Sequence, residues 1–161
     1  MCINDHWRFA INGGGEKNVD LPHTWNASDG QDGGNDYFRG VGMYTRSLRR
    51  PVFDPQQQVV YLEFCGVNAS ARVFLNDTLV TSHDGGYSTF RVNVTDCLQE
   101  ENILKVEVDN TVNDKVYPQK ADFTFYGGIY RDVRLIVLNK NHFAMDYFGT
   151  PGLKITPTIH G

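Results

Sequence analysis

The sequence predicts an all-β fold in which two antiparallel sheets pack face to face as a sandwich. Apolar and polar residues alternate in short runs spaced by about ten residues, the pattern of half-buried strands. Gly, Asn, Asp and Pro cluster between these runs, where turns need positive or fixed φ angles. Helical periodicity over ten or more residues is absent from the sequence. Short strands with turn signals between them favour a sandwich or jelly roll.

The predicted strands lie in the middle of the chain. They are seven runs: Met43–Leu48, Val59–Phe64, Ala71–Leu75, Leu79–Ser82, Thr89–Val94, Leu104–Val108 and Tyr130–Val137. Asn76 and Asp77 separate the third run from the fourth and have the composition of a tight hairpin turn. The segment Thr95–Glu100 is predicted to form one helical turn, with Thr95 or Asp96 as its N-cap.

The length of 161 residues fits one domain, 1–161, which can bury roughly two-thirds of its unfolded surface. Residues 1–40 are rich in loop-forming residues and are expected to wrap across the sandwich of residues 41–140. Scattered apolar side chains would anchor this wrapping segment: Trp7, Phe9, Val19, Leu21 and Trp25. Residues 141–161 show no clean alternation. We interpret them as an exit strap that leads toward a next domain.

Composition and charge exclude several classes of function. The net charge of −4 and the scattered basic residues argue against a nucleic-acid partner. No apolar run approaches the roughly 18 residues that span a membrane. The three cysteines form no CxxC pair and have no nearby histidine at metal-ligand spacing, which argues against a structural zinc site. The cysteines leave the compartment open.

Motifs for catalysis are also missing from the sequence. It contains no GxSxG, HExxH, GxxxxGK[ST] or GxGxxG pattern. A glycosidase needs two carboxylates at a defined separation, and the chain has 19 acidic residues. Those on predicted strands, Glu63, Glu107 and Asp109, are interpreted as parts of solvated strand faces.

Asp122 stands in the densest cluster of aromatic residues. Phe123, Phe125 and Tyr126 follow it, immediately before Gly127 and Gly128. Aromatic faces and a carboxylate are a combination that binds sugars, because rings stack on sugar C–H groups while the carboxylate accepts hydroxyl hydrogen bonds. The alternative is that these aromatic residues pack in the core or against another domain, and that Asp122 caps a turn.

Five segments, in order, resemble the N-terminal domain of family 2 glycoside hydrolases. They are Val19–Asn26, Tyr37–Tyr44, Leu62–Val67, His83–Phe90 and Tyr126–Val133. The resemblance implies a galactose-binding-like jelly roll, in agreement with the strand pattern. In that family an immunoglobulin-like domain and a TIM barrel follow, and the barrel carries both catalytic glutamates. Since this chain has neither, we expect a non-catalytic accessory domain with no turnover of its own.

The resemblance favours a β-galactosidase parent, with a β-glucuronidase or a β-mannosidase as alternatives. It implies that a loop reaches the barrel and contributes an acid to the sugar site, and this position falls on Asp122. An Asn that galactosidases supply from an early loop has no clear match here, so Asn35 or Arg39 are the candidates. Arg131 and Asp132 are expected to be structural. A polysaccharide-degrading parent would favour a periplasmic or secreted location.

Two other functions remain open at this point. An autonomous carbohydrate-binding or lectin-like module would bind sugar directly, through an exposed aromatic platform. A structural sandwich would serve protein contacts without any sugar. No cofactor is expected in this chain, and no Asp-rich loop in the sequence identifies a site for a structural cation.

Overall fold

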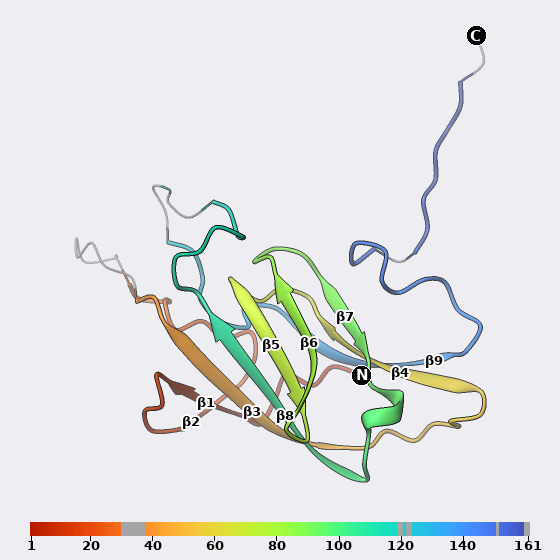
Figure 1. Cartoon of the computed structure of the whole chain (residues 1–161), viewed down its shortest axis with the longest axis horizontal. Coiled ribbons are helices and arrows are strands. Elements are labelled where there is room, and N and C mark those ends of the chain that lie inside the picture. Colours follow the sequence, from red (N-terminus) through yellow and green to blue (C-terminus); the bar gives the residue numbers. More distant parts are fainter. Residues whose placement is uncertain (30–37, 119–120, 122–123, 151, 160–161) are drawn as a thin grey trace.

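The computed structural model describes residues 1–29, 38–118, 121, 124–150 and 152–159. In this part of the chain two antiparallel sheets face each other (Figure 1). The strands are β1 (Trp7–Ile11), β2 (Lys17–Val19), β3 (Val41–Arg49), β4 (Gln58–Phe64), β5 (Ser70–Leu75), β6 (Thr78–Asp84), β7 (Phe90–Asn93), β8 (Glu101–Asp109) and β9 (Val133–Asn139). A 3₁₀ turn, η1 (Thr95–Cys97), lies between β7 and β8.

The two sheets differ in width. The larger sheet has six strands in the order β2-β1-β3-β8-β5-β6, and the smaller has three in the order β7-β4-β9. At its β9 edge the smaller sheet is extended by the N-terminal residues, since Cys2 forms a bridge with Arg134 and the Ile3 amide donates to the Val133 carbonyl at 2.9 Å. The chain then crosses to the larger sheet at Trp7.

The predicted sandwich fold is confirmed, and each of the seven predicted runs overlaps a strand. The last strand begins at Val133 instead of Tyr130, since the pairing of β9 with β4 starts at Val133, opposite Phe64. Asn76 and Asp77 form the expected turn, both with positive φ. Strands β1 and β2 were not predicted. They lie in the segment 1–40, where β1 has only five residues and β2 only three, too few for a clear alternation.

Apolar side chains from the inner faces of both sheets form one core. In β8 the inward residues Leu104, Val106 and Val108 are fully buried, while residues between them are exposed or half-buried. Strand β4 contributes Val60, Leu62 and Phe64 in the same way. Each such side chain stabilises the fold by about 1.5–3 kcal/mol. Trp7 is fully buried and donates from Nε1 to the Ile3 carbonyl, so it is a packing anchor.

Glu63 departs from the expectation of a solvated strand face, because only 4% of it is exposed. Its carboxylate accepts from Arg91 Nε at 2.6 Å and from Arg134 Nη1 at 3.3 Å. Arg91 also donates from Nη1 to the carbonyls of Met145 and Thr150. The segment after β9 therefore folds back over the outer face of the smaller sheet and covers Glu63. The alternation of apolar and polar residues predicts which face of a strand points away from the core. It does not predict that a later segment of the chain covers that face.

The buried charge of Glu63 gives a stability prediction. Glu63→Gln leaves Arg91, whose side chain is 10% exposed, without its counter-charge, and we expect a loss of about 3–5 kcal/mol in the free energy of unfolding. Asp77→Asn is the matched control, because Asp77 pairs with Lys105 but its side chain is 82% exposed; it should cost less than about 1 kcal/mol. Urea denaturation measures both. Equal losses in the two variants would contradict this account of Glu63.

Candidate functional site

The loops β2–β3 and β8–β9 carry the residues predicted from the sequence. Asn35 and Asp122 lie outside the described residues, whereas Arg39 is described. The described ends of the two loops meet at one end of the sandwich, where Phe38, Arg39 and Gly40 contact Asn110, the residue that follows β8. The structure thus brings together the described ends of the two loops. Sugar contacts by Asn35, Arg39 and Asp122 stay predictions.

Two buried asparagines hold these loop ends. Asn110 accepts at Oδ1 from the Gly40 amide at 2.7 Å and donates from Nδ2 to the Phe38 carbonyl at 3.2 Å. Asn26 donates from Nδ2 to the same carbonyl at 3.0 Å and accepts at Oδ1 from the Gly127 amide at 2.8 Å. The two side chains also meet, with Asn110 Nδ2 3.4 Å from Asn26 Oδ1. An uncharged amide supplies a donor and an acceptor at once, so both side chains fit a buried site.

Arg39 belongs to this network. Its Nη1 donates to the Asn110 carbonyl at 3.1 Å. Arg39 lines a small hollow together with Val116, Pro118 and the largely buried Phe125, all of which belong to the β8–β9 loop. The side chain of Arg39 therefore bridges the end of one loop and the wall of the other.

Gly127 and Gly128 let the β8–β9 loop approach the core closely. A Cβ at Gly127 would lie 2.5 Å from Asn110 Nδ2 and 2.6 Å from Asn26 Oδ1. Gly128 has a φ of +124°, and a Cβ there would lie 2.5 Å from the Tyr44 hydroxyl. A side chain at Gly127 would separate this loop from the asparagine network, and one at Gly128 would separate it from Tyr44.

His23 and Tyr44 lie beneath the same loop. Their Nδ1 and hydroxyl oxygen are 2.7 Å apart, and the Tyr44 hydroxyl accepts from the Ile129 amide at 3.4 Å. Burial, with a smaller contribution from the positive charge of Lys17, lowers the pKa of His23 to about 4. Burial raises the pKa of Tyr44 above its ordinary value. Both shifts favour the uncharged forms at neutral pH, and the hydrogen bond of this neutral pair joins the segment before Asn26 to β3.

Sequence reasoning did not single out Asn26 and Asn110 as functional residues. Asn26 and the two glycines lie in segments that carry the family resemblance, Val19–Asn26 and Tyr126–Val133, which was the available signal. Asn110 follows a strand directly, and an asparagine in that position ordinarily indicates a turn.

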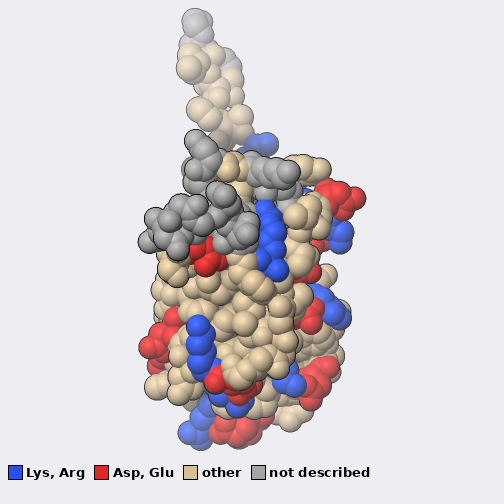
Figure 2. Space-filling model, turned by 90° about the vertical axis from the view of Figure 1, so that its left-hand side faces the viewer, with Lys and Arg blue, Asp and Glu red and all other residues tan. Residues whose placement is uncertain are grey.

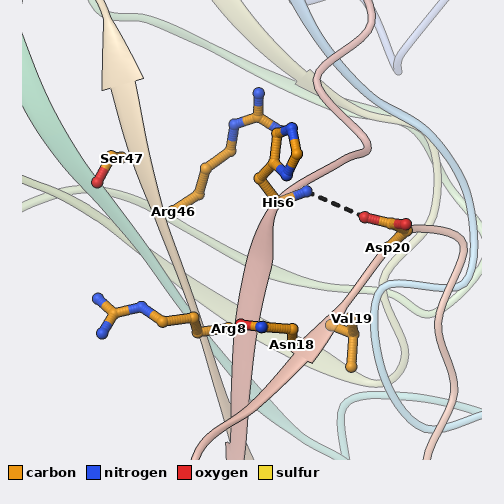
Figure 3. Close-up of a pocket in the computed structure, with 7 residues that line it drawn as sticks. All are labelled: His6, Arg8, Asn18, Val19, Asp20, Arg46 and Ser47. Carbon is orange, nitrogen blue, oxygen red and sulfur yellow. Dashed lines mark hydrogen bonds between the residues drawn. The ribbon is translucent and has the colours of Figure 1, made fainter.

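A separate hollow of ≈ 650 Å³ lies between β1, β2 and β3 (Figure 3). The His6 amide donates to Asp20 Oδ1 there at 3.0 Å. Arg46 donates from Nη1 to the Ile3 carbonyl and to Asp5, and Arg8 pairs with Glu16. The guanidinium groups of Arg8 and Arg46 point in different directions (Figure 3). Because they do not converge, this hollow lacks the fork geometry of an anion site.

Surface charge and metal-binding geometry identify no other centre in the described part of the chain. Lys and Arg side chains lie singly among acidic ones on the face shown in Figure 2. Among the described residues, no group of three His, Cys, Asp or Glu side chains is placed to hold a metal ion. No helix within the described ranges is long and apolar enough to cross a membrane.

The two packed antiparallel sheets make the fold a sandwich of the jelly-roll type, a class that includes lectin domains. A family model described as "Glycosyl hydrolase 2 galactose-binding domain-like" matches residues 41–144. Since this match covers more than half of the 161 residues, the chain belongs to the galactose-binding-like domains of glycosyl hydrolase family 2. The resemblance found in the sequence is thereby confirmed.

Relatives of this chain are named either β-glucuronidase or β-galactosidase. A β-glucuronidase from Bacteroides fragilis is 36% identical over 99% of this chain, which spans 24% of that protein. A β-galactosidase from Thermoanaerobacter pseudethanolicus is 30% identical over 99% of the chain, which spans 23% of it. The chain thus covers about a quarter of the length of these relatives.

Solved structures agree with this assignment. An FMN-binding β-glucuronidase from Facaelibacterium prausnitzii L2-6 matches with a TM-score of 0.89 and 41% identity, covering 94% of this chain and 24% of that one. A β-glucuronidase from Bacteroides uniformis, covalently bound to cyclophellitol-6-carboxylate aziridine, matches with a TM-score of 0.80 and 34% identity, covering 94% of this chain and 19% of that one.

The asparagine network gives a second stability prediction. Asn110→Ala removes the acceptor of the Gly40 amide and one donor to the Phe38 carbonyl. We therefore expect a loss of about 1–3 kcal/mol in the free energy of unfolding. Asn141→Ala, at an exposed position, should change it by less than about 0.5 kcal/mol. Amide hydrogen exchange at Gly40 and Gly127 should accelerate only in the Asn110 variant. Unchanged exchange at Gly40 would refute the role assigned to Asn110.

Proposed function

We propose that this chain is the N-terminal accessory domain of a family 2 β-glycosidase, and that the parent enzyme hydrolyses β-glucuronides. The observation that carries this proposal is the 41% identity over 94% of the chain to a β-glucuronidase with a TM-score of 0.89. The B. fragilis and B. uniformis relatives described above are also β-glucuronidases.

A β-galactosidase parent is the second candidate. It is supported by the T. pseudethanolicus relative, a β-galactosidase that is 30% identical over 99% of the chain, and by the resemblance noted in the sequence. Both candidates assign the same role to this domain, which is to support the catalytic domain and extend its loop end toward the substrate.

The partners in this proposal are the following domains of the same polypeptide, an immunoglobulin-like sandwich and a TIM barrel. Exposed apolar side chains gather in the segment after β9, where Phe143 is 66%, Phe148 85% and Ile155 89% exposed. Apolar residues in one exposed segment are typical of an interface. Their position supports contact between this segment and a further domain.

Asp122 is proposed to contact the sugar, with Asn35 and Arg39 as further contacts. The support for Asp122 is its position in the segment that resembles the family. The convergence of the ends of both loops on the Asn26 and Asn110 network supports a common site for the three residues, because side chains on loops fixed at their ends can be held in one geometry.

The test of the proposed function uses the complete gene product that contains this chain. Its kcat/KM should be higher for nitrophenyl β-D-glucuronide than for the β-D-galactoside or β-D-mannoside, by about 10²-fold or more. A preference for the galactoside would favour the second candidate. Absence of hydrolysis of all three substrates by a folded protein would overturn the proposal.

The role of Asp122 is tested in the same protein. We expect Asp122→Asn to lower kcat/KM by the equivalent of about 1–3 kcal/mol, since a substrate hydroxyl loses its charged acceptor. Asp114→Asn is the matched control, because Asp114 is an exposed acid of the same loop, and should leave kcat/KM unchanged. Melting temperatures should agree among the three proteins. If the two variants behave alike, Asp122 does not contact the substrate.

A further inference from the structure

The inner face at the β1–β2 edge of the larger sheet is covered by a loop segment. This sheet has six strands against three in the smaller one, and β1 and β2 form one of its edges. Residues 21–25 pack there instead of a strand, with the His23 ring 4.8 Å and the Trp25 ring 5.6 Å from the Phe9 ring. A loop covers such a face less completely than a sheet does.

A hollow of ≈ 360 Å³ remains at this place, lined by Phe9, Ile11, Gly15, Lys17, Trp25 and Phe38. Its volume lies within the range of small-molecule sites, about 300–1,000 Å³. Trp25 and Ile11 are half-buried, and Phe38 is 39% exposed. The hollow therefore presents aromatic side chains to solvent. Phe38 also belongs to the loop end that the asparagines hold, so the hollow adjoins the candidate site.

The aromatic side chains are fixed in place. The Phe9 and Trp25 rings are stacked, with an interplanar angle of 15°. Both sit on Gly42, where a Cβ would lie 2.7 Å from each ring. The Trp25 indole donates to the Phe38 carbonyl over a long distance, 3.4 Å. Rigid aromatic rings beside a weakly engaged donor are suited to a sugar ring, which offers C–H faces and hydroxyl groups.

Lys17 provides one positive charge at this hollow. It pairs with Phe9 across the β1–β2 ladder, and its Nζ lies 5.5 Å from the centre of the Phe9 ring. The neighbouring Glu16 pairs with Arg8 instead. Within the described ranges Lys17 forms no ion pair. Its ammonium group is therefore available to a carboxylate at the edge of an aromatic hollow.

We propose that this hollow binds a uronic acid residue of a carbohydrate, with the sugar ring against Trp25 and Phe38 and the carboxylate on the Lys17 ammonium. The proposal rests on the glycosidase function proposed above and adds to it a second contact with uronic acids, within the accessory domain itself. A neutral sugar would use the aromatic side chains alone and lose the charge contact.

The test uses this 161-residue chain and NMR spectroscopy of its two tryptophan indoles. Trp25 reports on the hollow, and the fully buried Trp7 is the internal control. The probes are methyl β-D-glucuronide, methyl β-D-glucoside and sodium acetate. The Trp25 indole signal should shift saturably with the glucuronide at millimolar Kd, about −4 kcal/mol, and more weakly with the glucoside. The Trp7 signal should not move.

Two variants test the charge contact of Lys17 and the ring contact of Phe38 separately. Lys17→Gln should weaken glucuronide binding about fivefold, the factor for one partly exposed charge pair, and leave glucoside binding unchanged. Phe38→Ser should weaken binding of both sugars. The matched controls are Lys140→Gln and Phe148→Ser, which alter exposed residues elsewhere and should leave both affinities unchanged.

Three results would overturn the proposal. The first is the absence of a saturable shift of the Trp25 signal up to about 50 mM glucuronide, a concentration well above the expected millimolar Kd. The second is an equal shift of the Trp25 signal with acetate. The third is an unchanged glucuronide affinity in Lys17→Gln. The parent assay is independent of this binding test. Binding here without hydrolysis of glucuronides by the parent would refute the proposed function alone, and hydrolysis without binding here would refute this inference alone.

Discussion

The unequal width of the two sheets is the constraint on which much of this structure depends. Six strands face three, and apolar residues on the inner face of the wider sheet must still be removed from water. The chain meets this requirement with segments that are not strands of either sheet. Residues 1–3 lie along β9, and residues 21–25 cover β1. Residues 1–3 form backbone hydrogen bonds with β9, whereas the amides of His23 and Trp25 donate to the carbonyls of Ile129 and Gly127, which lie outside the strands.

Polar side chains satisfy the backbone groups next to these segments that have no backbone partner. Asn26 and Asn110 bond the loop ends, and Asn4 joins the N-terminal segment to β9 by accepting from the Val133 amide at 3.0 Å. Leaving such a buried group unpaired costs about 1–3 kcal/mol. The same contacts that stabilise the covering segments therefore also fix where the β2–β3 and β8–β9 loops leave the sandwich. Stability of the fold and geometry of the candidate site depend on the same residues.

The sequence predicted those parts of the fold whose alternation is complete. Alternate positions are apolar and buried in β4, β5 and β8, because each of these strands buries one face in the core. Strands β1 and β2 were not predicted. Strand β1 has only five residues, and β2 has only three, none of them buried. Glu63 was misinterpreted, because the segment that covers it comes about 80 residues later in the chain and shares no local pattern with it. Of the candidate site, Arg39 and the two glycines lie in segments that carry the family resemblance, and a sugar contact by Arg39 stays a prediction. The buried amides of Asn26 and Asn110 look like ordinary turn residues in a sequence.

The contacts of Arg91 have a mechanical consequence. Arg91 fixes the carbonyls of Met145 and Thr150 against β7, and the N-terminal residues are bonded to β9. Both segments thus attach to the three-stranded sheet, β7-β4-β9 (Figure 1). Tension applied along the backbone at these two segments would therefore load the hydrogen bonds of that sheet.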